Sequence, residues 1–379
     1  MQDRPPVSAK IPPTALPRST DAMLDWLQLI RSRRVGPATF IRLMREHGSA
    51  RGALEALPAI ASAAGVRSYA PAPRHEIEAE WRAAEDAGAL PLLLCGPGYP
   101  ARLATIPDPP PLLWALGDPA LMAKPAVALV GARNASALGR RMASRLAREL
   151  GAAGLVVTSG LARGIDAAAH KAAMETGTMA AQAGGVDDIY PPENAGLAAE
   201  IAERGLRLSE MPMGYAPRAQ DFPRRNRIVS GLSLGVVVVE GALRSGSLIT
   251  ARAALDQGRE VMAVPGSPLD GRAGGCNALI RDGAILVRSA EDVLEALAEH
   301  LGERQHAPDA PDVPEPDAPV AGSDGMEARL LSLLGAAPVA EDALIREMRA
   351  PAAAVSAILL DLELAGQVRR HPGALVSLI

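Results

Sequence analysis

The residues of this chain that are best suited to bind an anion lie in one run, from Ser209 to Leu255. An arginine cluster at residues 224–227, with the sequence RRNR, precedes a four-valine run at 236–239, and the turn Ser245-Gly246-Ser247 follows that run. The valines are bounded by glycines and predict a parallel strand buried on both faces. Guanidinium groups bind phosphate through paired hydrogen bonds, and the start of a helix presents unpaired N–H groups to an anion. The run therefore predicts phosphate-binding groups on either side of one buried strand.

Two further loops stand where a predicted strand ends and a predicted helix begins. The first, VALVGARNASALGRRMA, matches neither the dinucleotide fingerprint nor a P-loop, and the second reads VVTSGLARGIDAAAH. Because the ligand crevice of a doubly wound sheet lies at the carboxyl ends of its strands, all three loops are expected at one edge. A plain strand-to-helix turn stays open as the alternative. The candidate residues are Gly131, Arg133 and Ser136 in the first loop and Gly160, Arg163 and Gly164 in the second.

The second loop also carries two residues that could do acid/base chemistry. Asp166 and His170 stand four apart on the predicted helix, a spacing that puts both side chains on one face within hydrogen-bonding reach. Two interpretations remain: a catalytic dyad, or an aspartate that stabilises the helix start and orients the histidine. The second is preferred.

Composition limits the class of protein. A net charge of -4 and a pI near 5.9 exclude a globally basic coat for nucleic acid, so any DNA contact is expected to be local. Cys95 and Cys276 form neither a CxxC pair nor a disulfide framework, which fits a reducing cytoplasm. Nothing in the sequence requires a metal or a cofactor. No membrane partner is expected, since no apolar run approaches the roughly 20 residues that span a bilayer.

The order of apolar runs and breaks predicts an α/β protein with accessory domains. Short apolar runs alternate with helical patterns through the middle of the chain, which is typical of a doubly wound parallel sheet. The predicted parts are a disordered tail (1–20), a small helical domain (21–85), the sheet domain (86–300), a Pro-rich acidic linker (301–325) and a winged helix (326–379).

The ordered motifs SGLARGIDAAAH, DFPRRNRIVSGLS, SGSLITARAAL, GREVMAVPG and CNALIRDGA closely resemble those of the DNA processing protein A (DprA, Smf) family. The resemblance spans Gly98 to about Ile285, and more weakly the two ends of the chain. It implies an extended Rossmann-like domain that binds single-stranded DNA, usually as a homodimer. It also implies a mediator that protects incoming DNA and loads a RecA-type recombinase in natural transformation, without catalytic turnover.

The resemblance assigns DNA contacts residue by residue. The family's Gly-Ser-Arg loop matches Gly131-Ala132-Arg133, with alanine in place of serine, and its FPxRNR motif matches Phe222 to Arg227. Asn226 could equally be a structural cap. The implied phosphate contacts are Arg133, Arg163, Arg224 and Arg227, with Arg225 in the same cluster, and the backbone N–H groups of Gly131, Gly160, Ser245, Gly246 and Ser247; Ser136, Gly164 and Asn226 belong to the same loops, and Phe222 is the expected stacking surface.

Three segments depart from the family pattern. Ala181-Gln182 stand where the family usually has Val-Leu, and the residues alone do not explain the change. Arg34 takes the place of the first glycine of a helix-hairpin-helix turn, so a sterile-alpha-motif-like bundle is preferred there. The third winged-helix helix, residues 352–365, carries no Lys or Arg, so protein contact is preferred for it over a DNA groove, with Arg369 and Arg370 left as possible backbone contacts.

Two other functions stay open. A Rossmann-like nucleotide hydrolase or phosphoribohydrolase would use the same loops for one nucleotide and Asp166 with His170 for chemistry. An adaptor would instead bind partners through its end domains. For the DNA reading, aromatic residues make up only 2% of the chain, so affinity is expected to be mostly electrostatic, salt-dependent and indifferent to sequence.

Overall fold

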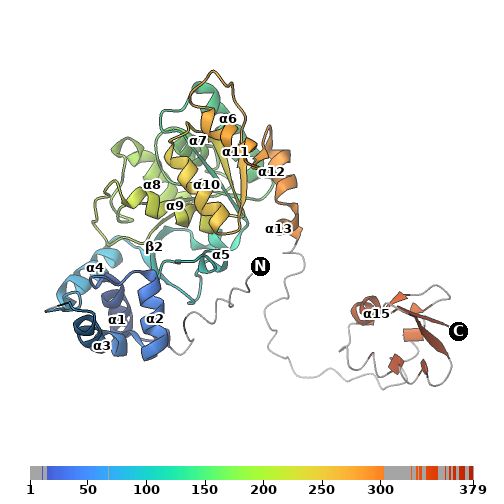
Figure 1. Cartoon of the computed structure of the whole chain (residues 1–379), viewed down its shortest axis with the longest axis horizontal. Helices are drawn as coiled ribbons and strands as arrows, with labels where there is room; N and C mark the ends of the chain where they lie inside the picture. The colour runs from blue at the N-terminus through green and yellow to red at the C-terminus, as the bar shows by residue number, and fades with distance from the viewer. Residues whose placement is uncertain are drawn as a thin grey trace. The chain divides into compact units, whose positions relative to one another are not determined.

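The computed structural model describes residues 11, 15–66 and 68–302, and in the C-terminal part residues 326, 330–331, 333–334, 339–348, 355, 358–359, 362–363, 367–371 and 375–378. The chain divides into two compact units, Met1–His306 and Ala307–Ile379 (Figure 1). Most of the predicted tail lies outside the described residues. Its described members Ile11 and Ala15 are buried, and Ser19 caps the first helix.

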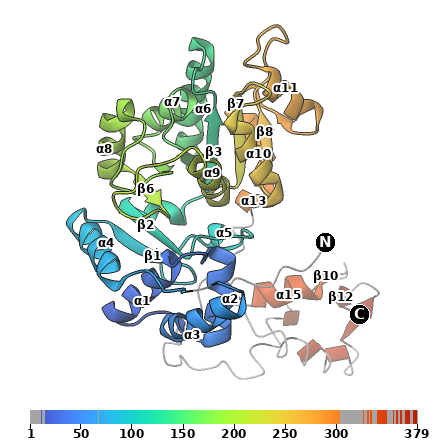
Figure 2. The same ribbon diagram turned by 60° about the vertical axis from the view of Figure 1, so that its left-hand side comes forward.

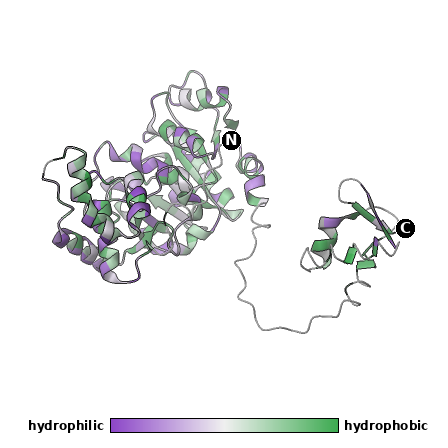
Figure 3. Ribbon diagram, turned by 60° about the horizontal axis from the view of Figure 1, so that its bottom comes forward, coloured by the Kyte–Doolittle hydropathy of each residue, from purple (hydrophilic) through white to green (hydrophobic). Residues whose placement is uncertain are grey.

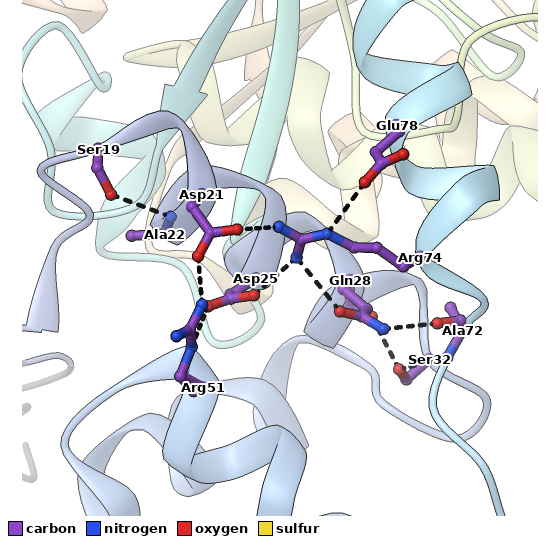
Figure 4. A network of polar contacts seen from close by, with 10 residues as sticks. All are labelled: Ser19, Asp21, Ala22, Asp25, Gln28, Ser32, Arg51, Ala72, Arg74 and Glu78. Atoms are coloured by element: carbon purple, nitrogen blue, oxygen red, sulfur yellow. Dashed lines mark hydrogen bonds and ion pairs between the residues drawn. The ribbon is translucent and has the colours of Figure 1, made fainter.

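Four helices form the N-terminal domain: α1 (Thr20–Arg31), α2 (Pro37–His47), α3 (Ala50–Ala63) and α4 (Arg74–Asp86). Trp26 and Phe40 are fully buried between them, with ring centroids 4.8 Å apart. Asp21 and Asp25 of α1 lie between Arg51 of α3 and Arg74 of α4 and form ion pairs with both (Figure 4). This network ties three helices together at the surface of their apolar core.

A nine-stranded sheet follows, in the order β1-β2-β6-β5-β4-β3-β7-β8-β9. The strands from β6 to β9 in this order run parallel, and β1 and β2 add an antiparallel edge. The strands are β1 (Leu90–Leu93), β2 (Leu112–Gly117), β3 (Ala126–Gly131), β4 (Val156–Ser159), β5 (Thr178–Ala181), β6 (Leu206–Ser209), β7 (Gly235–Glu240), β8 (Glu260–Ala263) and β9 (Ile285–Leu286).

Helices cover both faces of this sheet, as a doubly wound fold requires (Figures 1 and 2). Val236 and Val238 of β7 face the core under α9, α10 and α11, whereas Val237 and Val239 face the core under α6, α7 and α12. The valine run is therefore buried on both faces, as predicted, and the central strands are the apolar centre of the domain (Figure 3). The helices are α5 (Ala101–Ala104), α6 (Ala137–Ala152), α7 (Ile165–Ala172), α8 (Ala195–Arg204), α9 (Asp221–Leu232), α10 (Gly246–Asp256), α11 (Gly274–Arg281), α12 (Ala290–Ala296) and α13 (Ala298–Gly302), with short 3-10 turns η3 (Pro119–Ala123) and η4 (Pro192–Asn194).

The strand order reverses between β3 and β7. Successive strands β3, β4, β5 and β6 extend the sheet in one direction, and β7, β8 and β9 extend it in the other. Loops that leave β3 and β7 therefore diverge and open a crevice at the carboxyl ends of these two strands. The three predicted anion-binding loops follow β3, β4 and β7, which are neighbours in the middle of the sheet.

The helical domain is fastened to the antiparallel edge of the sheet. The Trp26 indole N–H donates to the Pro111 carbonyl at 3.0 Å, and the Trp114 indole N–H donates to Glu80 at 2.8 Å. Arg31 forms an ion pair with Glu80 at 2.8 Å and also donates to the Glu210 carbonyl at 3.0 Å. Buried polar contacts thus join the helical domain to the sheet domain.

The second unit contains β10 (Val339–Ala340), α15 (Glu341–Met348), β11 (Val368–His371) and β12 (Leu375–Leu378). Its sheet has the order β10-β12-β11, and β11 pairs antiparallel with β12 as the predicted hairpin. The predicted turn at Pro372-Gly373 and most of the predicted helix at 352–365 lie outside the described residues.

Candidate nucleic-acid interface

An open pocket of about 800 Å³ lies at the switch point between β3 and β7. Its walls come from the ends of these strands, from the turn after β4, from the start of α9 and from the start of α10. All three predicted loops thus meet in one place. The predicted site residues that line it are Gly131, Arg133, Gly160, Phe222, Arg225, Asn226, Ser245, Gly246 and Ser247.

The pocket carries an excess of positive charge. Arg133, Arg225, Arg244 and Arg272 line it, and among its lining residues the one carboxylate is the buried Asp166. Arg244 and Arg272 are not part of any motif used in the sequence analysis. Arg272 is already paired with Asp270 at 3.0 Å and with Glu240 at 3.5 Å. The other three guanidinium groups against one carboxylate make the pocket attractive to a phosphate backbone.

Arg225 forms the floor of this pocket. It is 5% exposed, and one guanidinium nitrogen donates to the Ala181 carbonyl at 2.8 Å. Burial, together with the nearby charge of Arg133, lowers the pKa of Arg225 to about 10, and Asp166 opposes this shift. Its Nε has no hydrogen-bond partner among the described residues, so a cation stays incompletely solvated beneath the pocket. Such a group favours the approach of an anion.

Aromatic rings form one wall. The Arg133 guanidinium lies over the Phe222 ring, 5.0 Å from its centroid, and the centroid of the Tyr190 ring lies 5.4 Å from that of Phe222. Tyr190 is 46% exposed. Tyr190 stands in the segment DDIYPPEN and was not among the predicted site residues, because an isolated tyrosine beside two prolines gives no periodic signal.

The start of α10 opens onto the pocket. Ser245 caps the helix, its hydroxyl accepting from the Ser247 N–H, and the first turn contains no acidic residue. Asn226 donates from its side chain to the Gly246 carbonyl at 3.3 Å, so it ties α9 to this turn, as the structural alternative for this residue proposed. The positive end of α10 therefore faces the pocket beside Arg244.

The start of α6 is different, and the prediction for Ser136 is corrected. The Glu240 carboxylate accepts hydrogen bonds from the Ser136 backbone N–H at 3.1 Å and from its hydroxyl at 2.7 Å. A Cβ on Gly139 would collide with the same carboxylate, so glycine makes room for it. Ser136 lines a neighbouring groove rather than the pocket. Its N–H and hydroxyl groups already bind the Glu240 carboxylate.

The backbone N–H groups of the turn between β4 and α7 also bind a carboxylate of the chain itself. Asp166 accepts from the Gly160 N–H at 3.1 Å and from the Ala162 N–H at 3.4 Å, so the prediction that the Gly160 N–H contacts phosphate is corrected. Glycine is needed there because a Cβ would collide with the Arg225 guanidinium. Gly164, with φ of +81°, lets the turn pack against the Ala132 carbonyl and does not line the pocket.

Asp166 and His170 have separate structural partners. His170 is fully buried; its Nε2 accepts from the Leu161 N–H at 3.3 Å, and its Nδ1 lies 2.7 Å from the Thr178 hydroxyl. Burial first, and Arg225 second, lower the pKa of His170 to about 3, so the ring is neutral. Burial raises the pKa of Asp166 above its usual range, against the opposing charge of Arg225. Both residues therefore have structural roles, as preferred, but the prediction that Asp166 orients His170 is corrected, because Leu161 and Thr178 hold the ring instead.

The remaining predicted arginines lie outside the pocket lining. Arg163 is exposed at its margin and pairs with Glu193 at 3.4 Å. Arg224 is half-exposed and pairs with Glu210 at 3.1 Å. Arg227 is buried and pairs with Glu210 at 2.6 Å and Asp108 at 3.0 Å. Its predicted phosphate contact is therefore corrected: it holds α9 to the segments that follow β6 and α5.

Gln182 now has a physical explanation. Its side-chain oxygen accepts from the buried Arg207 Nε at 2.7 Å, and its nitrogen donates to the carbonyls of Gly185 and Asp188. Arg207 also donates to the Val186 carbonyl. A buried arginine and a buried glutamine thus satisfy one another and hold the loop that leads to Tyr190.

The end domains add two facts. Arg34, in the place of the hairpin glycine, adopts φ of +66°, the left-handed backbone conformation that glycine usually supplies. Arg369 and Arg370 stand within β11 and not in the loop of the hairpin. Within the residues that the structure describes, no helix is long and apolar enough to span a bilayer, and no group of three or more His, Cys, Asp or Glu is placed to hold a metal ion.

Known families match three parts of this chain. The family described as "DNA recombination-mediator protein A" matches residues 92–298, the "DprA-like N-terminal HHH domain" matches residues 20–83, and the "DprA winged helix domain" matches residues 314–374. The N-terminal match favours the helix-hairpin-helix alternative, so the preference for a sterile-alpha-motif-like bundle is corrected.

Individual relatives and solved structures agree. The chain is 42% identical over 283 residues to "Protein Smf" of Escherichia coli (strain K12), covering 74% of this chain and 75% of the relative, and 48% identical over 204 residues to "DNA processing protein DprA" of Bacillus subtilis (strain 168), covering 53% and 69%. It resembles the X-ray structure of DprA from Streptococcus pneumoniae with a TM-score of 0.56 and 40% identity, covering 59% of this chain and 78% of that one. A structure of DprA from Helicobacter pylori, described by its single-stranded DNA binding mode, matches with a TM-score of 0.50 and 31% identity over 53% and 94%.

Proposed function

Because this chain belongs to the DprA/Smf family of DNA recombination-mediator proteins, we propose that it binds single-stranded DNA and loads a RecA-type recombinase onto it during natural transformation. The binding site in this proposal is the pocket between β3 and β7. The protein acts through binding and not through turnover, in the cytoplasm where the strand and the recombinase meet.

One observation carries the DNA-binding part. The exposed Arg133 and the buried Arg225 share an open pocket with the positive end of α10. A phosphate placed there would receive charge-assisted hydrogen bonds from Arg133 and backbone donors from the start of α10. The buried charge of Arg225 beneath it adds attraction that solvent screens only weakly.

Loop geometry favours a single strand over a duplex. The cations stand on strand ends and helix starts around a concave pocket, a shape that follows one flexible backbone. A duplex reader would instead offer a protruding helix with base-edge donors. The Helicobacter pylori relative, described by its single-strand binding mode, supports the same choice.

The nucleotide-hydrolase alternative is disfavoured by the same geometry. It needs Asp166 and His170 free for proton transfer, whereas both are buried and bonded to backbone groups or to Thr178. A histidine whose pKa is about 3 is a weak general base near neutral pH.

The test is fluorescence anisotropy of a labelled oligo-dT strand and a duplex of equal length at two salt concentrations. We expect the wild type to prefer the single strand and Arg133→Ala to raise its Kd roughly tenfold, because a hydrogen bond to a charged group contributes about 1.5 kcal/mol. The salt dependence should fall by about 0.7 in log–log slope, the value for one lost contact to a single strand. The matched control is Arg281→Ala, which removes an arginine that is 79% exposed and lies outside the pocket.

Equal affinity for single strand and duplex, or an Arg133→Ala variant that binds like the control, would contradict the proposal. The recombinase step has its own readout, the lag before a RecA-type filament grows on a strand covered by single-strand-binding protein. Wild-type protein should shorten this lag and Arg133→Ala should not.

The homodimer is proposed on the family resemblance and has a candidate surface. β9 is an edge strand, and its two residues Ile285 and Leu286 are 37% and 41% exposed. An exposed apolar edge is a natural place for pairing between copies. Sedimentation of the wild type and of Leu286→Lys tests it, and a Leu286→Lys variant with the wild-type mass would exclude this surface.

A further inference from the structure

Aromatic side chains are scarce in this chain and most are unavailable to a ligand. All nine lie within the described residues. Trp26, Phe40, Tyr99 and Trp114 are buried, and Tyr69 and Trp81 belong to the helical domain. Tyr215 donates its hydroxyl to Asp221 and lies under Arg218. Tyr190 and Phe222 remain as the aromatic pair that lines the pocket.

These two rings are not equivalent. Arg133 lies over the Phe222 ring, 5.0 Å from its centroid, and Phe222 is only partly exposed. Tyr190 packs on Phe222 with a ring distance of 5.4 Å and an interplanar angle of 56°, yet 46% of the residue is open to solvent. The cation already occupies a face of the phenylalanine, and the tyrosine retains the accessible aromatic surface.

We propose that a nucleobase of the bound strand stacks on Tyr190, whose ring packs on Phe222, which in turn lies under Arg133. This inference rests on the proposed function, because it assumes that a single strand enters the pocket. Arg133 lines the pocket and lies over the Phe222 ring on which Tyr190 packs, so one nucleotide can place its phosphate on the arginine and its base on the tyrosine.

The consequence is a dependence on bases that electrostatics alone does not produce. Stacking needs an unpaired base with a free π-face, which a single strand offers and a duplex does not. Strand preference then comes from the base as well as from backbone flexibility. The contact uses the ring and not the hydroxyl, so phenylalanine at position 190 should serve as well as tyrosine.

The experiment compares two labelled strands of equal length and charge, one of oligo-dT and one of abasic deoxyribose units, in anisotropy titrations. For the wild type we expect about tenfold weaker binding of the abasic strand, the scale of one base–aromatic stack. Tyr190→Ala should bind oligo-dT about tenfold more weakly and the abasic strand as well as the wild type does. Tyr190→Phe should retain the wild-type difference between the strands.

Leu243→Ala is the matched control, since Leu243 is an apolar side chain at the same sheet edge that is 67% exposed and carries no ring. Its two affinities should equal those of the wild type. If Tyr190→Ala retains the wild-type preference for oligo-dT, or loses affinity equally for both strands, the stacking role is overturned while single-strand binding stands. A wild type that does not bind single strands at all overturns the proposed function instead.

Discussion

The helices α6, α7 and α10 start at the same edge of the sheet, and the positive end of each helix is balanced in one of two ways. The starts of α6 and α7 each hold a carboxylate of the protein itself. Glu240 accepts from the Ser136 N-cap of α6, whereas Asp166, in the first turn of α7, accepts from the Gly160 and Ala162 N–H groups of the loop before the helix. The start of α10 receives only the hydroxyl of its own Ser245 and opens onto the pocket. A helix start favours negative charge whatever molecule supplies it.

The difference separates structural turns from ligand-binding turns. Where the chain supplies the anion, the backbone donors fasten loops to strands and are unavailable to DNA. Where it does not, the donors and the helix dipole remain for a phosphate. The comparison therefore predicts that removing an internal carboxylate costs stability, whereas adding one to α10 costs DNA binding.

The largest effect is expected from Asp166→Ala. The change leaves the Gly160 and Ala162 N–H groups without their acceptor and removes the negative charge that offsets the buried Arg225. Loss of such a buried partner costs about 3 kcal/mol of unfolding free energy, to be measured by urea denaturation followed by circular dichroism. Asp166→Asn, which retains one acceptor oxygen, should lose less. If Asp166→Ala were as stable as the wild type within experimental error, the Asp166 carboxylate would not stabilise the turn before α7.

A smaller effect is expected from Glu240→Ala at α6. The Ser136 N–H and hydroxyl lose their acceptor, which costs about 2 kcal/mol in the same denaturation assay. The vacated helix start should then bind free anion, so inorganic sulfate should raise the unfolding midpoint of this variant more than that of the wild type. Glu260→Ala, which removes a partly exposed glutamate on β8, is the control and should show no extra response to sulfate. If sulfate raised the unfolding midpoint equally in all three proteins, the start of α6 would not bind an anion when Glu240 is absent.

Local sequence pattern predicted the parallel core of the sheet and the C-terminal hairpin. The valine run of β7, the alternation of strands and helices, and the C-terminal hairpin follow from periodicity and turn residues over a few positions. Most candidate residues also line one pocket, because strand ends in a parallel sheet share one edge. Gly131, Arg133 and the α10 turn come together for this reason.

Distant partners explain what the sequence could not predict. Ser136 was expected at the pocket, but its acceptor Glu240 lies 104 residues later and joins it only when β3 and β7 pair. Arg227 stood in a promising cluster, yet Glu210 and Asp108 bury it in ion pairs. Which arginine of a cluster faces solvent depends on such partners, and no spacing along the chain reveals them.

The smallest effect is expected from a variant that gives the start of α10 the carboxylate that α6 and α7 already have. Gly246 is the first residue of α10, and a Cβ there would meet no atom within 4 Å, so Gly246→Asp fits without strain. The new charge should raise the unfolding free energy by about 0.5 kcal/mol through the helix dipole. It should also weaken oligo-dT binding roughly fivefold, since a phosphate and the carboxylate compete for the same donors.

Gly246→Asn separates charge from shape in this test. The amide has the size of the carboxylate but no negative charge, so it should retain nearly wild-type affinity in the anisotropy titration. If aspartate and asparagine weaken binding equally, the side chain merely blocks the pocket and the start of α10 is not where phosphate binds. If only aspartate weakens binding, and the loss shrinks at high salt, then one carboxylate has converted a ligand-binding turn into a structural one, as Glu240 does at α6.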